Sequence, residues 1–132
     1  MDDVMRDLGR RAIAAGWRWM PGCADHLGRR VVTRDRHHGF PFAWDIDKPG
    51  LTVELGLPDF SDPATLGCLD AQLAERFGCP VVVTPFGKMF RAWRMLPPDV
   101  DEFYYRLCAI RTATTPAGAK VAALEAAPKV AP

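Results

Sequence analysis

The sequence predicts an α+β domain in which an antiparallel sheet of about five strands carries helices packed on one face. Three observations favour this fold: capped helical segments, short segments of alternating polarity between turn residues, and a globular composition. The 132 residues are 48% hydrophobic and 25% charged, which suits one packed core. We expect a single globular domain over residues 1–128 and a loose tail over residues 129–132.

The central helix has the clearest start and stop signals. Asp62 is placed to cap its first turn, and Pro63 suits the first helical position. Gly78 and Pro80 end the helix. Gly67, inside the helix, predicts a close approach of another backbone. One apolar face follows from the spacing of Leu66, Leu69, Leu73 and Phe77.

Two further helices are predicted near the ends of the chain. Asp2 and Asp3 open an amphipathic segment that stops at Gly16. Thr115-Pro116 repeats the signal of a capping residue followed by proline, ahead of an alanine-rich helix. Residues 99–112 fit either a helix or a strand, and their apolar spacing favours the helix.

The strands are predicted from alternating polarity and from turn residues. Trp17 and Trp19 have a period of two, and Asp47-Lys48-Pro49-Gly50 indicates a type II turn. In residues 89–95, alternate side chains should point to opposite faces of the sheet. The predicted strands are Arg29–Asp35 paired with Phe40–Ile46, then Leu51–Leu55, Val81–Val83 and Met89–Met95.

One segment resembles other proteins. It reads Pro58-Asp59-Phe60-Ser61-Asp62-Pro63-Ala64-Thr65-Leu66-Gly67-Cys68-Leu69. This segment is similar to a group of short phage and prophage proteins of GC-rich bacteria, which carry Asp-Pro-Ala-Thr-Leu-Gly-Cys-Leu at a helix start. Residues 16–22 and 121–128 resemble the same group more weakly. The resemblance implies an origin in a mobile element; it brings no assigned activity and no catalytic residue.

Composition and cysteine spacing bear on the compartment. No apolar run reaches the length of a membrane span, and the N-terminus lacks the apolar core of a signal peptide, so a cytoplasmic protein is expected. Cys23, Cys68, Cys79 and Cys108 have no framework spacing and are expected to be small core residues, Cys68 among them. No cofactor is predicted, and the oligomeric state stays open.

Metal sites have weak support. Cys23 and His26 have the spacing of a zinc ligand pair, which His37 and His38 could complete if the loops converged. Only one short pair is present, however, and adjacent histidines seldom bind the same ion. No metal is therefore predicted, and Cys23 and His26 are the weak candidates.

An enzyme is the least favoured class. Asp45 and Asp47 would share a strand face, and Glu54 or Asp59 could join them around Mg²⁺. Ordinary roles at a strand end and in a turn explain these residues better. The sequence shows no nucleophile motif and no glycine motif for binding phosphate. No catalytic residue is predicted.

A basic hairpin supports nucleic-acid binding as the alternative function. Its basic residues could contact phosphates, while Phe42 or Trp44 stacks on bases. The net charge of +1 and the acidic Asp35 inside this patch weigh against it. The candidates are Arg29, Arg30, Arg34, Arg36, His37 and His38.

Protein–protein interaction is the leading functional class. Trp17, Trp19 and Trp93 are expected to be mostly core residues. An exposed tryptophan beside Arg18, Arg91 or Arg94 would instead be typical of an interface hot spot. Together with the small size and the phage resemblance, this predicts a host or phage protein as partner. The protein would then be an accessory factor, an assembly component or an inhibitor of a host system such as an anti-defence protein. The candidates are Trp17, Arg18, Trp19, Arg91, Trp93 and Arg94.

Overall fold

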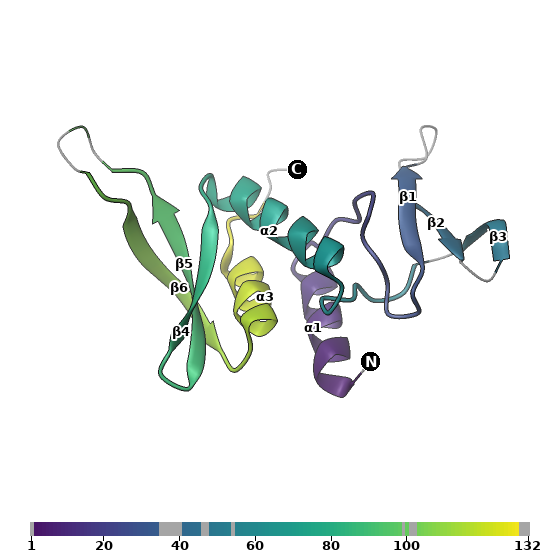
Figure 1. The fold of residues 1–132 in the computed structure, drawn as a ribbon, viewed down its shortest axis with the longest axis horizontal. Helices are drawn as coiled ribbons and strands as arrows, with labels where there is room; N and C mark the ends of the chain where they lie inside the picture. Colours follow the sequence, from purple (N-terminus) through teal and green to yellow (C-terminus); the bar gives the residue numbers. More distant parts are fainter. Residues whose placement is uncertain are drawn as a thin grey trace. The chain divides into compact units, whose positions relative to one another are not determined.

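The computed structural model describes residues 2–34, 41–45, 48–53, 55–98, 100 and 103–129. Within these residues helices and antiparallel strands follow one another along the chain, which confirms the α+β class (Figure 1). The helices are α1 (Asp3–Ala14), α2 (Pro63–Phe77) and α3 (Pro116–Ala126). The strands are β1 (Arg30–Arg34), β2 (Pro41–Asp45), β3 (Lys48–Val53), β4 (Val81–Phe86), β5 (Met89–Leu96) and β6 (Arg106–Ala113).

The chain divides into two compact units, residues 1–68 and 69–132. Each unit has its own antiparallel sheet, in the order β1-β2-β3 in the first and β4-β5-β6 in the second. The described strands therefore form two sheets of three, where the sequence predicted one sheet of about five. Each sheet is built from three strands that are consecutive in the sequence, and α2 comes between the two sets of strands in the order of the chain. The single domain expected over residues 1–128 stays a prediction.

The capping signals of the helices are confirmed. The Asp2 carboxylate accepts a hydrogen bond from Met5 N at 2.9 Å, and the Asp62 carboxylate accepts one from Thr65 N at 3.0 Å. Thr115 Oγ1 accepts one from Gly118 N at 2.9 Å. No helix in the described part of the chain is long and apolar enough to cross a bilayer.

Two glycines in helices have opposite surroundings. An added Cβ at Gly67 would meet no atom of the described residues within 4 Å, so the predicted close approach of a backbone is wrong for that part of the chain. The close approach of another segment occurs at Gly9 in α1 instead. A Cβ at Gly9 would lie 3.1 Å from Leu57 Cβ and 3.1 Å from the Pro58 carbonyl oxygen. The helix therefore packs directly on the segment that leads into α2.

The strands differ from the prediction at three places. Trp17 and Trp19 lie outside the strands. β3 begins at Lys48, inside the turn predicted over residues 47–50. The helix favoured for residues 99–112 is wrong, since residues 106–113 form β6 and pair with β5. Hydrogen-bonded pairing with the neighbouring strand β5 decided the structure of this segment, although its apolar residues have the spacing of a helix.

Buried apolar side chains form the interior of each unit. Two of the cysteines were correctly expected there, namely Cys23 and Cys79, whereas Cys68 is half-buried and Cys108 is exposed. In the first unit the buried apolar residues include Leu8, Ala12, Trp17, Cys23, Ala24, Val31 and Phe60. In the second unit they include Leu69, Leu73, Cys79, Ala92, Ala119, Val121, Ala123 and Leu124.

Candidate interaction surface

Strand register decides which side chains share a face of the β4–β5–β6 sheet. Thr84 lies opposite Arg91 in the β4–β5 ladder, and Met95 lies opposite Leu107 in the β5–β6 ladder. Directly paired residues point to the same face, and the next residue along a strand points to the other. Arg91, Trp93 and Met95 therefore share one face, while the residues between them lie on the opposite face. This is the alternation predicted for residues 89–95.

Helix α3 covers one face of this sheet (Figure 1). Ala92 lies on that face and is fully buried. Arg94 lies on the same face, where its guanidinium is 5.6 Å from the Phe77 ring centroid and donates a long hydrogen bond of 3.5 Å to the Phe77 carbonyl oxygen. Arg94 thus caps the C-terminal end of α2. Its position separates it from Arg91 and Trp93, with which the sequence grouped it.

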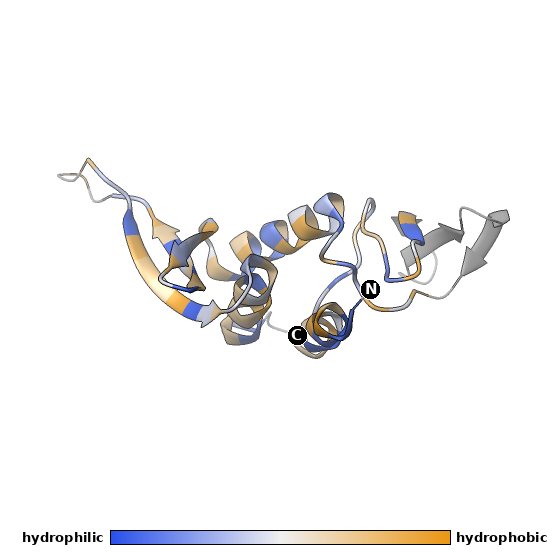
Figure 2. Ribbon diagram, turned by 60° about the horizontal axis from the view of Figure 1, so that its bottom comes forward, coloured by the Kyte–Doolittle hydropathy of each residue, from blue (hydrophilic) through white to orange (hydrophobic). Residues whose placement is uncertain are grey.

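The opposite face, here called the outer face, is mostly apolar. Phe86 is 47% exposed, Met89 36% and Leu107 48%. In Figure 2 the strands of this sheet show long hydrophobic stretches. Exposed apolar side chains that share one face in this way are a feature of interaction sites on soluble proteins. The outer face comprises Val82, Thr84, Phe86, Met89, Arg91, Trp93, Met95, Leu107, Ala109 and Thr112.

Arg91 is held between two aromatic rings of the outer face. Its guanidinium carbon lies 3.5 Å from the Phe86 ring centroid and 5.3 Å from that of Trp93. The Trp93 indole is fixed in turn, because its Nε1 donates a hydrogen bond of 2.8 Å to Thr84 Oγ1. Side chains held in place before binding lose less entropy when a partner arrives. The outer face therefore presents an ordered arginine between aromatic side chains.

Sequence reasoning missed the aromatic residues that precede β6. Phe103, Tyr104 and Tyr105 are 93%, 83% and 59% exposed. Phe103-Tyr104-Tyr105 by itself favours a strand, but the helical spacing of Phe103 with Leu107 and Ile110 favours a helix in which Phe103 faces the interior, so these aromatic residues are not among the predicted interaction residues. Three consecutive aromatic residues are a signal for a strand or an interface rather than for an amphipathic helix.

The other predicted interaction residues lie in the first unit. Trp17 is 7% exposed, and its ring packs edge-on against Trp19 at 5.9 Å and Phe60 at 5.3 Å between centroids. Trp17 is therefore an interior residue. Trp19 is half-buried, and Arg18 is exposed. These residues belong to the first unit, whereas Arg91 and Trp93 belong to the second.

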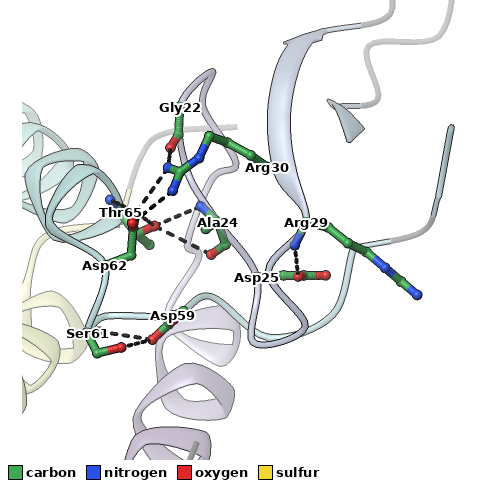
Figure 3. Close-up of polar contacts among 9 residues, drawn as sticks. All are labelled: Gly22, Ala24, Asp25, Arg29, Arg30, Asp59, Ser61, Asp62 and Thr65. Carbon is green, nitrogen blue, oxygen red and sulfur yellow. Dashed lines mark hydrogen bonds and ion pairs between the residues drawn. The ribbon is translucent and has the colours of Figure 1, made fainter. Parts of the chain in front are cut away.

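The basic hairpin uses one of its arginines inside the first unit. Arg30 forms a bidentate ion pair with Asp62, at 2.9 Å and 3.1 Å, and also donates to the Gly22 carbonyl oxygen (Figure 3). Asp62 also accepts a hydrogen bond of 2.8 Å from Thr65 Oγ1. Arg29 donates its backbone N–H to Asp25. Arg34 ends β1, and Arg36, His37 and His38 lie outside the described residues.

The Arg30–Asp62 pair predicts a pH dependence of stability. The hydrogen bonds from Arg30 lower the pKa of Asp62 from 3.8 to about 2. A lowered pKa in the folded state adds stability above pH 3.8, and this is lost as the pH falls toward 2. Because Arg30 is half exposed, we expect Asp62→Asn to lower the free energy of unfolding by about 1 kcal/mol at neutral pH.

Urea unfolding at a series of pH values checks this prediction. The difference between the wild type and Asp62→Asn should shrink steadily below pH 4 and vanish only as the pH falls below about 2. Asp7→Asn, at an exposed position of α1, is the control variant. A difference that stayed constant over this range would show that the ion pair does not stabilise the fold.

The weak metal candidates already have partners. His26 Nδ1 accepts a hydrogen bond of 2.9 Å from Leu57 N. Burial and a hydrogen bond with Cys68 raise the pKa of the Cys23 thiol to about 12, which disfavours the thiolate that a metal needs. Within the described part of the chain, no three His, Cys, Asp or Glu side chains gather in a way that could hold a metal ion. Asp47 and Glu54 lie outside that part.

A pocket of about 410 Å³ adjoins the covered face of the second sheet. Val83, Phe90 and Pro116 are among the residues that line it. Its charged residues, Asp70 and Lys120, form an ion pair with Nζ 2.8 Å from Oδ1. Because each neutralises the other, the pocket offers a ligand no unpaired charge from these residues, and the outer face remains the stronger candidate.

Comparison of the chain with protein-family models, with curated proteins and with solved structures gives no match. Function is therefore inferred from the residues of the outer face and from their geometry.

Proposed function

We propose that this protein acts by protein–protein interaction and that the outer face of the β4–β5–β6 sheet is the surface it uses. The observation that supports this is the ordered Arg91 among exposed apolar side chains. Tryptophan and arginine are the residue types most enriched at the energetic centres of interfaces, and methionine and phenylalanine are enriched around them. A face of this composition gains free energy when a partner covers it.

The phage resemblance of residues 58–69 gives this interaction a biological setting. In the proposal the protein is phage- or prophage-derived, works in the bacterial cytoplasm, and binds a host or phage protein. It would serve as an accessory factor, an assembly component or an inhibitor of a host system. Catalysis is no part of the proposal, because the outer face groups apolar side chains around a single charge.

A comparison of two matched variants tests the proposal. Phe86→Ser with Leu107→Ser removes two exposed apolar side chains of the outer face. Val4→Ser with Leu27→Ser removes two that are also exposed, both 60%, but lie in the first unit. Tagged proteins are used to recover partners from nuclease-treated lysate of the bacterium that carries the gene, and recovery is quantified by mass spectrometry.

We expect the wild type and the control to retain the same protein in stoichiometric amount. The outer-face variant should retain at least tenfold less, since the loss of a single hot-spot side chain costs about 2 kcal/mol or more and about 1.4 kcal/mol is already a factor of ten in affinity. Circular dichroism checks that both variants are folded. Equal recovery by all three proteins would contradict the assignment of the surface. Recovery of nucleic acid alone, or loss of every partner on nuclease treatment, would contradict the proposed function.

Nucleic-acid binding by residues 29–38 is the alternative proposal. Arg30 is a poor position at which to test it, because its replacement also breaks the ion pair with Asp62. Arg34→Glu with Arg36→Glu is the better variant. The alternative requires that this variant abolish a salt-sensitive mobility shift of the wild type with single-stranded DNA.

A further inference from the structure

We infer that the partner docks an acidic segment on the outer face, with a carboxylate that binds the Arg91 guanidinium. This inference rests on the proposed function and adds the chemistry of the partner. It uses three observations: the fixed position of Arg91, its lack of an anion within the described residues, and the absence of other charges from the face that surrounds it.

Arg91 is positioned, yet its guanidinium has no anionic partner among the described residues. The Phe86 ring covers one side of the guanidinium plane at 3.5 Å. The guanidinium lies over the rings of Phe86 and Trp93. None of the described residues forms an ion pair or a side-chain hydrogen bond with this guanidinium. The N–H groups of a stacked guanidinium lie in its plane, where they match the two oxygens of a carboxylate.

The surroundings of Arg91 make an anion necessary for docking. Arg91 is the one charged residue in the outer face as defined above, and exposed Phe86, Met89 and Leu107 belong to the same face. A partner that covers these apolar side chains also takes Arg91 out of water. A cation buried without a counter-ion destabilises a complex strongly, whereas a bidentate carboxylate compensates it. The partner must therefore supply an acidic side chain among apolar ones.

The charged residues of the sheet also favour an acidic partner. Every charged residue in β4, β5 and β6 is an arginine, namely Arg91, Arg94, Arg106 and Arg111. An acidic partner is therefore attracted to the sheet as a whole. A second copy of the chain, docked face to face by a twofold axis, is disfavoured because the outer face as defined above contains no acidic residue, so each Arg91 would be buried without a counter-ion.

The apolar side chains favour a protein over a nucleic acid. Single-stranded nucleic acids bind by stacking bases on open aromatic rings. Here one side of the Phe86 ring is occupied by Arg91, and much of the remaining face consists of Val82, Met89, Met95 and Leu107. Aliphatic and thioether side chains of this kind pack against a peptide's apolar residues instead.

Random short peptides displayed on yeast are the probe. The library is sorted for binding to the fluorescent wild-type protein, and clones that also bind the outer-face variant Phe86→Ser with Leu107→Ser are discarded. The same sort is repeated with Arg91→Met, which keeps a long apolar side chain beside Phe86. Arg111→Met is the matched control, because Arg111 pairs with Ala92 of the covered face. Thermal melts followed by circular dichroism confirm that each variant is folded.

The wild type and Arg111→Met should select peptides with Asp or Glu between apolar residues, and Arg91→Met should select apolar peptides without that acid. In a selected peptide, Glu→Gln should weaken binding to the wild type about tenfold and leave binding to Arg91→Met nearly unchanged. Selected peptides without acids would overturn the inference and leave the proposed function standing. If the selection yields no peptide whose binding depends on the outer face, both the inference and the proposed function are overturned.

Two further measurements cover the other occupants. In sedimentation equilibrium of the wild-type protein alone, we expect no dimer whose formation depends on Arg91. The same measurement on Arg91→Met checks this. An oligothymidylate should bind no more weakly to Arg91→Met than to Arg111→Met. Either dimerisation or oligonucleotide binding that depended on Arg91 would overturn the acidic peptide as the occupant of this face.

Discussion

Asp25→Ala is expected to lower the free energy of unfolding of the first unit by about 4 kcal/mol. The Asp25 side chain is fully buried. Its Oδ1 accepts backbone N–H groups from Leu27 at 3.0 Å and Arg29 at 2.8 Å, and its Oδ2 accepts that of Gly56 at 2.9 Å. Alanine would leave these donors without their acceptor, and each buried donor so left costs about 1–3 kcal/mol.

Urea unfolding and amide hydrogen exchange test this expectation. The N–H groups of Leu27, Arg29 and Gly56 should lose protection together, because one carboxylate binds them all. Asp25→Asn should be intermediate, since its amide retains one acceptor oxygen and sets a donor against the remaining N–H groups. Asp7→Ala, at an exposed position, is the control. A cost for Asp25→Ala no larger than that of the control would exclude this role.

Features decided by neighbouring residues were predictable from the sequence. The cap of α2 depends on Asp62 and on Thr65 only three residues later, so its signal is local. The hairpin of β4 and β5 likewise follows from Gly87, whose φ of 63° suits a tight turn. The alternation of Arg91 and Trp93 with Ala92 also requires only the period of a strand.

Features decided by distant residues were not predictable. Nothing near Asp25 in the sequence indicates that its carboxylate binds Gly56, which is 31 positions away. β6 is a strand because β5 lies beside it, although its apolar spacing suited a helix. Periodicity could place Arg91 and Trp93 on one face and Arg94 on the other, but which of these faces stays uncovered depends on where α3 packs.

A second large effect on the free energy of unfolding is expected at Gly56, where two loops of the first unit meet. Gly56→Ala is expected to lower the free energy of unfolding by about 3 kcal/mol. The added Cβ would lie 2.6 Å from His26 Nδ1 and closer still to Cε1, so the imidazole must move. Because Nδ1 accepts the Leu57 N–H at 2.9 Å, that movement also removes a hydrogen bond between two distant loops.

A double-mutant cycle separates this clash from a general intolerance of alanine. In the background of His26→Ala the ring is gone, so Gly56→Ala should cost less than about 1 kcal/mol there. The control is Gly67→Ala, where the added Cβ meets no atom within 4 Å and helix propensity predicts a gain of about 1 kcal/mol. Urea unfolding of these variants gives all the terms. Additive costs for Gly56→Ala and His26→Ala would show that the two residues are not in contact, and the loop arrangement around buried Asp25 would have to be redrawn.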